Sequence, residues 1–328
     1  MTKFLENPIE KAKPLFIERM KLLLKDREDY EKFCYYSGKH LVNSIRCNTL
    51  KIPPEELKKR LEKKWKIRSP FSEYKEIMII DQELSPGELG NSIEHILGYY
   101  YIQEISSMMP ILTLKPDKNE IFLDIASSPG SKTTQAAAMM ENQGTIIANE
   151  INLGRIMPLA TNLQRCGVTN TIITKHDGAV LCNKLKKINF KFDKILLDAP
   201  CSGEGTIRSS PKTVFMFSEN LIKTLAGIQK KLLENALKVL KVNGEIVYST
   251  CTHAPEENES VVSYILENYP VKIEDIQLPK ELKTRSGIPE WKNIKYHKEI
   301  NKCVRIYPQD NDTEGFFIAK LKKLWEIE

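Results

Sequence analysis

The chain has 328 residues, of which 41% are hydrophobic and 28% charged, and this balance excludes an intrinsically disordered protein. The sequence has no run of about 18 apolar residues, as a membrane-spanning helix would need, and the first residues lack the apolar core of a signal peptide. With a formal net charge of +6, we expect a soluble, cytoplasmic protein without membrane association, built from a small domain and a larger one.

The N-terminal part is predicted to contain short helices and a strand. Pro14–Leu24 has the apolar spacing of an amphipathic helix, and a second helix through Leu57 and Leu61 begins with prolines and acids at residues 53–56. Asn43–Leu50 between them is expected to form a strand. Turn residues accumulate from Ser85 to Gly98, so we predict a domain boundary near residue 100, dividing the chain into 1–100 and 101–328.

The positive charge is concentrated in this N-terminal part. Residues 1–75 carry 19 Lys and Arg against 11 Asp and Glu, which gives +8, whereas the rest of the chain carries −2. A basic region of this kind suggests an anionic partner such as nucleic acid, although a lysine-rich surface is often only a solvated face.

After residue 100, short apolar runs alternate with helix-length segments, which is typical of an α/β fold with a mostly parallel sheet. The expected strands are Ile121–Ile125, Thr145–Asn149, Thr171–Thr174, Phe192–Leu197 and Glu245–Ser249. The expected helices are Lys132–Met140, Leu153–Cys166, Leu221–Leu240 and Glu257–Asn268. Two further runs, Cys303–Tyr307 and Phe316–Leu321, are expected to form an antiparallel hairpin around a polar turn at residues 310–312.

The first of these strands runs directly into a loop of small residues and then a helix. The loop is Ala126, Ser127, Ser128, Pro129, Gly130, Ser131 and Lys132. Small residues at a strand-to-helix turn let a nucleotide-like ligand lie against backbone N–H groups at the carboxyl edge of the sheet. Neither the GxGxxG pattern of dinucleotide-binding folds nor a GxxxxGK[ST] phosphate loop occurs, and a turn without a ligand remains an alternative.

Four acidic residues end four successive strands. They are Asp124, Glu150, Asp177 and Asp198. A carboxylate in the position of Glu150 can accept both hydroxyls of a ribose, and Asp177 could accept the amino group of an adenine. One such acid commonly only solvates a loop, but a series on one sheet edge favours an adenosine-type ligand.

Two of the seven cysteines follow adjacent strands. Cys201 comes after the fourth strand and Cys251 after the fifth, so both thiols are expected in one cleft beside Asp198. A single buried cysteine is usually inert, whereas two thiols beside a ligand site indicate covalent chemistry. The odd number of cysteines, without CxxC or Cys/His spacing, predicts free thiols, no disulfide framework and no bound metal.

At these residues the chain resembles the NOL1/NOP2/Sun family of RNA (cytosine-5) methyltransferases, from about Asn43 to about Leu321. The motifs that carry the resemblance are residues 198–203 (DAPCSG), 249–251 (STC), 315–319 (GFFIA), 46–50 (RCNTL) and the Pro-Gly loop ending at Lys132. The family usually shows Cys-Ala-Ala-Pro-Gly-Gly-Lys in that loop, where this chain has Ala-Ser-Ser-Pro-Gly-Ser-Lys.

The resemblance implies a Rossmann-like catalytic domain that uses S-adenosylmethionine, preceded by a small α+β RNA-binding domain. It further implies that residues 126–132 lie along the methionyl end of the cofactor, with Glu150 on the ribose, Arg155 alongside, Asp177 on the adenine, and Asp198 between cofactor and base. Cys251 is the implied nucleophile, Cys201 assists product release, and Lys132 positions the base. Arg46 and Asn48 belong to the implied RNA-binding element.

The resemblance therefore predicts methyl transfer to carbon 5 of cytosine in RNA, with tRNA as the first choice of substrate. Ribosomal RNA is the alternative within the class, and a noncatalytic RNA-binding assembly factor is the alternative outside it. A methyltransferase acting on an exocyclic nitrogen is disfavoured, because Asp-Pro-Pro-Tyr would be expected where this chain has DAPC at residues 198–201. The sequence leaves the oligomeric state open.

Overall fold

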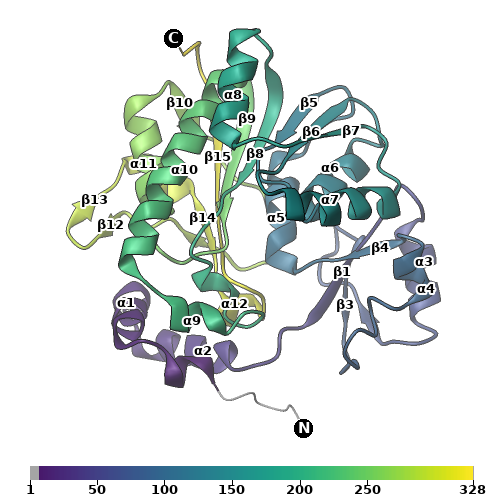
Figure 1. The fold of residues 1–328 in the computed structure, drawn as a ribbon. Coiled ribbons are helices and arrows are strands. Elements are labelled where there is room, and N and C mark those ends of the chain that lie inside the picture. Colours follow the sequence, from purple (N-terminus) through teal and green to yellow (C-terminus); the bar gives the residue numbers. More distant parts are fainter. Residues whose placement is uncertain (1–6, 328) are drawn as a thin grey trace.

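The computed structural model describes residues 7–327, and within them a nine-stranded sheet forms the centre of the molecule (Figure 1). Its strand order is β11-β14-β15-β9-β8-β5-β6-β7, and β10 pairs with β15 beside this path. The strands are β5 (Ile121–Asp124), β6 (Thr145–Asn149), β7 (Thr171–Thr174), β8 (Phe192–Asp198), β9 (Leu240–Thr250), β10 (Val271–Ile273), β11 (Arg285–Ser286), β14 (Val304–Ile306) and β15 (Phe316–Lys323).

Strands β5 to β9 are parallel, which confirms the predicted α/β class. Their carboxyl ends share one edge of the sheet, so the loops that follow them lie close together. On the other side, β15 runs antiparallel to both β9 and β14, as the predicted hairpin requires. The polar segment inside that hairpin is a helical turn, α12 (Pro308–Asn311).

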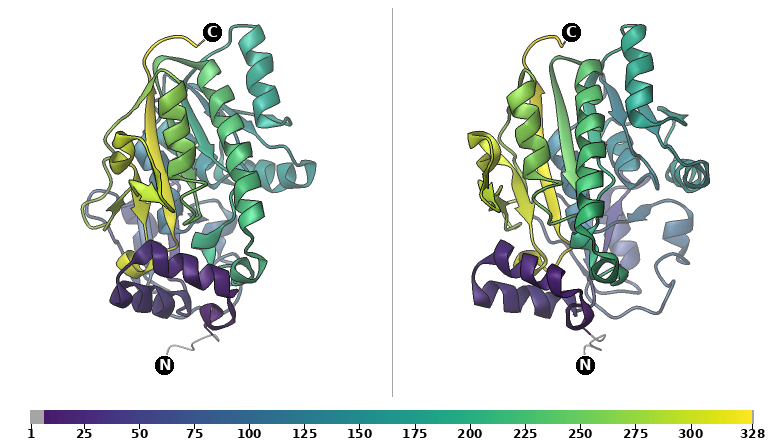
Figure 2. Two further views of the ribbon diagram at one scale, coloured as in Figure 1. Left: turned by 90° about the vertical axis from the view of Figure 1, so that its left-hand side faces the viewer. Right: turned by 60° about the vertical axis from the view of Figure 1, so that its left-hand side comes forward.

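Helices cover both faces of this sheet (Figures 1 and 2). One face packs against α5 (Ile105–Leu114) and α6 (Ser131–Met139), and the other against α8 (Gly178–Lys187), α10 (Glu219–Val239) and α11 (Glu259–Asn268). The strands alternate between the two cores: Leu197 and Tyr248 point to the α10 side, Leu196 and Val247 to the α5 side. Burial of both faces explains why these strands appear in the sequence as continuous apolar runs.

A second, four-stranded sheet of order β2-β3-β1-β4 lies beside the central one. It contains β1 (Asn43–Cys47), β2 (Ile67–Arg68), β3 (Ile77–Ile80) and β4 (Tyr100–Ile102), with α3 (Pro54–Leu61) and α4 (Ile93–Ile96). The predicted boundary near residue 100 therefore falls at the last strand of this sheet.

The first helices are not part of this small sheet domain. They are η1 (Pro8–Lys11), α1 (Pro14–Leu24) and α2 (Arg27–Ser37), and they pack under the larger domain (Figure 2). Phe16 and Phe33 share an apolar core with Val214, Phe217 and Tyr307 of the larger domain. The sequence predicts one domain over residues 1–100. In the structure, residues 7–100 instead divide into a group of helices, η1, α1 and α2, and a separate four-stranded sheet.

The remaining elements are one helix of 14 residues, α7, and several short helices and strands. They comprise α7 (Leu153–Cys166), η2 (Glu204–Thr206), α9 (Lys212–Met216), β12 (Glu290–Trp291), β13 (Ile294–Lys295) and η3 (Lys298–Lys302). None of the helices in residues 7–327 is both long enough and apolar enough to cross a lipid bilayer.

Candidate active site

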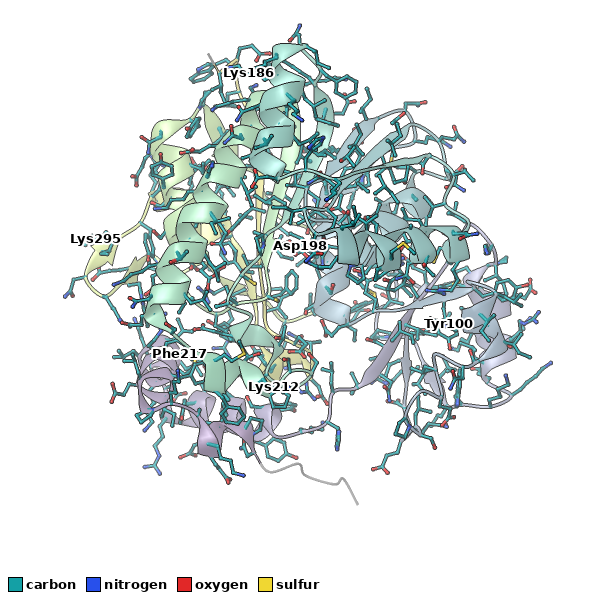
Figure 3. The ribbon with its side chains drawn as sticks, viewed as in Figure 1. Tyr100, Lys186, Asp198, Lys212, Phe217 and Lys295 are labelled. Carbon is teal, nitrogen blue, oxygen red and sulfur yellow. The ribbon has the colours of Figure 1, made fainter. Side chains whose placement is uncertain are left out.

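A cavity of about 310 Å³ opens at the carboxyl edge of the parallel strands, around Asp198, which Figure 3 labels near the middle of the molecule. The segments that follow β5, β6, β7, β8 and β9 form its walls together with α10. The lining residues are Ile125, Ala126, Ser128, Asn149, Glu150, Ile151, Arg155, Asp177, Gly178, Asp198, Ala199, Pro200, Cys201, Ile228, Leu232 and Cys251.

Three of the four strand-end acids line this cavity, namely Glu150, Asp177 and Asp198. Asp124 does not, because its side chain is buried beneath the loop and accepts a hydrogen bond of 2.7 Å from the Thr133 hydroxyl. Burial, reinforced by the nearby charge of Asp198, raises the pKa of Asp124 to about 7. Asp124 therefore fixes the start of α6 from below.

Glu150 and Asp177 are held by backbone groups of the loops that carry them. Glu150 is 2% exposed, and one carboxylate oxygen accepts a hydrogen bond from the backbone N–H of Asn152 at 2.8 Å. Arg155 is mostly exposed; its guanidinium lies 3.6 Å from Glu150 and donates to the Ser128 carbonyl at 2.8 Å. Asp177 caps α8 by accepting from the backbone N–H of Val180.

The small-residue loop contributes fewer side chains to the cavity than we predict. Ala126 and Ser128 line it, whereas Ser127, Pro129, Gly130 and Ser131 are not among the lining residues. The Ser127 hydroxyl donates to the Asn149 carbonyl at 2.9 Å, and Gly130, with φ of +102°, precedes the first turn of α6. These four residues shape the turn instead of forming the cavity wall.

The cavity residues fit S-adenosylmethionine. Apolar side chains of Ile151, Ile228 and Leu232 offer walls for an adenine, and Glu150 is placed as an acceptor for ribose hydroxyls. A Cβ on Gly178 would stand 2.6 Å from Ile125 Cγ2, so only glycine leaves this part of the cavity wall open. The residues that would hold the cofactor are thus present at one sheet edge.

The two predicted catalytic thiols are in contact. Cys201 Sγ lies 3.4 Å from Cys251 Sγ, and both cysteines line the cavity. The contact with Cys251 and burial raise the pKa of Cys201 well above its ordinary value. The thiol form of Cys201 is therefore favoured, and in this contact either sulfur can be the hydrogen-bond donor.

Lys132 and Asp198 form an ion pair next to these thiols. The Lys132 ammonium lies 2.7 Å from Asp198 Oδ2, although the Lys132 side chain is only 8% exposed. Ser249 donates to Asp198 Oδ1 at 2.8 Å, and Lys132 donates to the Ser107 hydroxyl at 2.9 Å. The structure thus places all four predicted catalytic residues around one cavity edge.

The two predicted RNA-binding residues are buried in the protein, and the prediction that they contact RNA directly disagrees with their positions. Arg46 is 3% exposed and donates to the Ser131 carbonyl and the Thr134 hydroxyl, both at 2.8 Å. Asn48, also 3% exposed, donates to the carbonyls of Gly98 and Cys166. Both residues join the small sheet to helices α6 and α7 of the larger domain.

Several site residues carry no motif that sequence reasoning can use. Ser107, at the start of α5, is the hydroxyl partner of Lys132 and lies outside the motifs named above. Ser249, in β9, begins the motif at residues 249–251, but that motif does not indicate its hydrogen bond to Asp198. Ile151 and Ile228 are 60% and 43% exposed, and both line the cavity. An exposed isoleucine beside a strand-end acid is the available signal.

No three His, Cys, Asp or Glu side chains in residues 7–327 are grouped to hold a metal ion.

Comparison with protein families places most of the chain in two matched regions. Residues 111–322 match the family described as 16S rRNA methyltransferase RsmB/F, and residues 13–105 match the N-terminal domain of 16S rRNA methyltransferase RsmF.

Two curated relatives differ in how much of their length this chain spans. A tRNA (cytosine(49)-C(5))-methyltransferase of Pyrococcus abyssi is 43% identical over 297 residues, which cover 90% of this chain and 93% of the relative. Ribosomal RNA small subunit methyltransferase F of Vibrio cholerae is 40% identical over 316 residues, which cover 95% of this chain but 64% of the relative.

Solved structures have the same fold over nearly the whole chain. A methyltransferase homologue from Pyrococcus horikoshii matches with a TM-score of 0.83 and 34% identity, covering 97% of this chain and 98% of that one. NSun6 from Pyrococcus horikoshii, crystallised with the S-adenosylmethionine analogue SFG, matches with a TM-score of 0.80 and 26% identity, covering 96% and 99%.

Proposed function

The chain belongs to the RsmB/F family of S-adenosylmethionine-dependent RNA (cytosine-5) methyltransferases, and on this premise we propose that its substrate is tRNA and that it acts through a covalent adduct between Cys251 and the target cytosine. The observation that carries the covalent route is the contact between the sulfurs of Cys201 and Cys251, 3.4 Å apart at the edge of the cofactor cavity.

The need for a covalent step follows from the chemistry of the base. Carbon 5 of cytosine is a poor nucleophile, and addition of a thiolate to carbon 6 moves ring electrons onto carbon 5. When bound, S-adenosylmethionine supplies the electrophilic methyl group. A base must then take the proton from carbon 5, and the electron pair of that C–H bond re-forms the double bond between carbons 5 and 6. The bond between carbon 6 and Cys251 breaks with its electron pair going to the sulfur, and aromaticity returns.

We assign distinct roles to the two thiols. Cys251 attacks carbon 6, and Cys201, which its surroundings keep protonated, supplies a proton to the Cys251 sulfur as that sulfur departs. Asp198 and Lys132 hold the ring of the target base from the other side of the cavity edge. Glu150 holds the ribose of the cofactor, Asp177 its adenine, and Arg155 closes that side.

The preference for tRNA rests on the extent of similarity. The tRNA enzyme of Pyrococcus abyssi aligns with this chain at 43% identity and the ribosomal RNA enzyme of Vibrio cholerae at 40%, and the higher identity to the tRNA enzyme supports tRNA as the first candidate. Ribosomal RNA remains the second candidate. A noncatalytic RNA-binding factor would not need two contacting thiols beside a cofactor cavity, and the retained pair argues against that alternative. The cytoplasmic location stays a prediction.

A direct test is to incubate the enzyme and cofactor separately with unmodified tRNA and with 16S ribosomal RNA, and then to map 5-methylcytosine by bisulfite sequencing. We expect conversion-resistant cytosines in tRNA and none in 16S RNA. Methylation of 16S RNA alone would overturn the substrate assignment. Methylation of neither RNA, by a protein that binds the cofactor, would favour the noncatalytic alternative.

A further inference from the structure

We propose that Gln229 and Glu257 are positioning residues. They hold the loop that bears Cys201 so that its thiol stays in contact with the thiol of Cys251, and product release depends on them. This inference rests on the proposed function, in which Cys201 assists release.

The loop that bears Cys201 is anchored on both sides of the cysteine. The Gln229 side-chain N–H donates to the Pro200 carbonyl at 2.9 Å, just before Cys201. The backbone N–H of Ser202, just after it, donates to Glu257 Oε2 at 3.0 Å. Two side chains from outside the loop therefore fix the peptide groups that flank the thiol.

The two anchoring side chains also bind each other. Gln229 donates to Glu257 Oε2 at 2.8 Å, and both residues are 0% exposed. The backbone carbonyl of Glu257 accepts a hydrogen bond of 2.5 Å from the Tyr248 hydroxyl, which ties this pair to β9, the strand that leads to Cys251. The anchor thus connects the loop of one thiol to the strand of the other.

Gln229 occupies an unusual position for a polar residue. It lies on the buried face of α10 with Ile222, Ala226, Leu233 and Ala236, where the helical repeat favours an apolar side chain. Its Oε1 has no hydrogen-bond partner among the described residues. Burial of a partly unpaired amide is unfavourable. The hydrogen bonds that Gln229 donates to the Pro200 carbonyl and to Glu257 compensate for this cost.

A hydroxyl contact also joins the loop that bears Cys201 to the loop that bears Cys251, and this contact depends on Gln229 and Glu257. The Ser202 and Thr252 hydroxyls lie 2.7 Å apart, and each follows one of the thiols in the chain. Because Ser202 is itself held by Glu257, loss of the anchor would loosen both contacts. The Glu257 carboxylate also acts with the Cys251 contact and burial to keep the pKa of Cys201 raised.

The test compares Gln229→Ala, Glu257→Ala and the conservative Glu257→Gln with the matched control Glu256→Gln. Glu256 is the preceding acid, but its carboxylate pairs with Arg19 at 2.8 Å and accepts from the Trp291 indole N–H at 3.0 Å, and within residues 7–327 it has no hydrogen bond to the Cys201 loop. Each protein is given unmodified tRNA and cofactor, and two quantities are measured: multiple-turnover methylation, and covalent protein–RNA complex on a denaturing gel. Cofactor affinity and thermal unfolding midpoint serve as folding checks.

We expect Gln229→Ala and Glu257→Ala to slow turnover about tenfold or more, since misplacing a reacting group by about 1 Å can cost about a hundredfold. The covalent complex should accumulate at the same time, as it should in Cys201→Ala. Glu257→Gln, which keeps an acceptor oxygen for Ser202, should recover part of the turnover. Glu256→Gln should leave both quantities near the original enzyme.

Two results would overturn the positioning role. One is a fall of both turnover and covalent complex in the alanine variants and also in Glu257→Gln, with all three proteins folded. That result would mean that these residues contribute only to the stability of the fold. The other is unchanged turnover in both alanine variants. If Cys201→Ala itself accumulated no covalent complex, the proposal that Cys201 assists product release would be wrong. This result does not depend on the Gln229 and Glu257 variants, so the two failures can be told apart.

Discussion

Lys132 shows how a single side chain can be assigned from its contacts. A buried ammonium requires compensation, and here Asp198 supplies a charge at 2.7 Å while Ser107 supplies an oxygen at 2.9 Å. This pair lies at the carboxyl edge of the sheet, and we propose above that it positions the target base.

We therefore expect Lys132→Met to reduce kcat/KM for RNA by about a hundredfold, because it removes a group that orients the base. Cofactor affinity should change only a few-fold, since Lys132 is not among the residues that line the cavity. Ser107→Ala, which removes the hydroxyl contact of Lys132 but leaves its ion pair with Asp198, is the matched control and should cost less. A loss of cofactor affinity as large as the loss of kcat/KM would contradict the assignment.

Buried titratable groups predict how stability depends on pH. Burial raises the pKa of Asp124, Glu204 and Glu314 to about 7 in each case. A carboxyl whose folded pKa exceeds its unfolded pKa stabilises the fold fully below about pH 4 and loses that contribution as pH rises through the folded value. Burial lowers the pKa of His253 to about 3, and its contribution is instead present above about pH 6.5 and lost in acid.

Asp124→Asn isolates one of these groups. Between about pH 5 and about pH 8 the unfolding free energy of this variant should fall less than that of the original protein, by up to about 1.4 kcal/mol per pH unit. Urea unfolding at a series of pH values measures the difference. Parallel curves for the two proteins would show that Asp124 does not titrate in this range.

Among the elements, those whose apolar pattern is complete within one segment are predicted best. The strands Thr145–Asn149 and Thr171–Thr174 and the helix Leu153–Cys166 have the predicted bounds. Helix α8 is absent from the prediction, because it begins with glycine and has only ten residues, four of which are buried. For Arg46 and Asn48 the resemblance implies an RNA-binding element, whereas both side chains are buried against protein groups. A motif identifies a residue but does not state which way its side chain points.

The position of Arg46 in β1 gives a prediction at this scale. Burial lowers the pKa of Arg46 to about 10, which is still well above neutral pH. The guanidinium therefore stays charged, and it donates hydrogen bonds to Ser131, Thr134 and Gln103. Arg46→Ala should lower the unfolding free energy by about 2–4 kcal/mol through lost packing and unpaired partners.

Arg68→Ala is the matched control. Its half-exposed ion pair with Asp81 should be worth less than about 1 kcal/mol. Denaturant titration of both variants tests the comparison. If Arg46→Ala weakened RNA binding while stability stayed unchanged, the direct RNA contact that the motif predicts would be correct after all.

At the scale of the whole molecule, the order of segments in the chain differs from their order in space. Arg19 of α1 reaches Glu256 at 2.8 Å, and Arg285 binds Asp29 of α2 as well as Asp310. The contacts of Arg19 with Glu256 and of Arg285 with Asp29 join residues more than two hundred positions apart. No local pattern encodes such docking, so the sequence predicts the helices but not the half of the molecule to which they attach.

The uneven charge is a property of the whole molecule and predicts salt-dependent tRNA binding. Residues 1–75 carry a net +8, and neutralising phosphates releases counterions, so affinity should fall at least about tenfold between about 50 and about 200 mM salt. Replacing the exposed Lys63 and Lys66 with Glu should weaken binding and flatten this dependence.

The matched control for this substitution is Lys186→Glu with Lys187→Glu. These lysines end α8, and Figure 3 shows Lys186 at the opposite end of the molecule from the small sheet domain. We expect a much smaller effect on tRNA affinity, measured by filter binding. Equal effects of the two double variants would place the RNA elsewhere.

The most direct measurement is identification of the amino acid that bonds to RNA. Cys201→Ala protein is incubated with unmodified tRNA and cofactor, the covalent complex is isolated and digested, and the crosslinked peptide is sequenced by mass spectrometry. We expect one modified cytosine attached to Cys251, and no complex from the Cys201→Ala, Cys251→Ala double variant. Attachment at another residue, or a complex that persists in the double variant, would contradict Cys251 as the nucleophile.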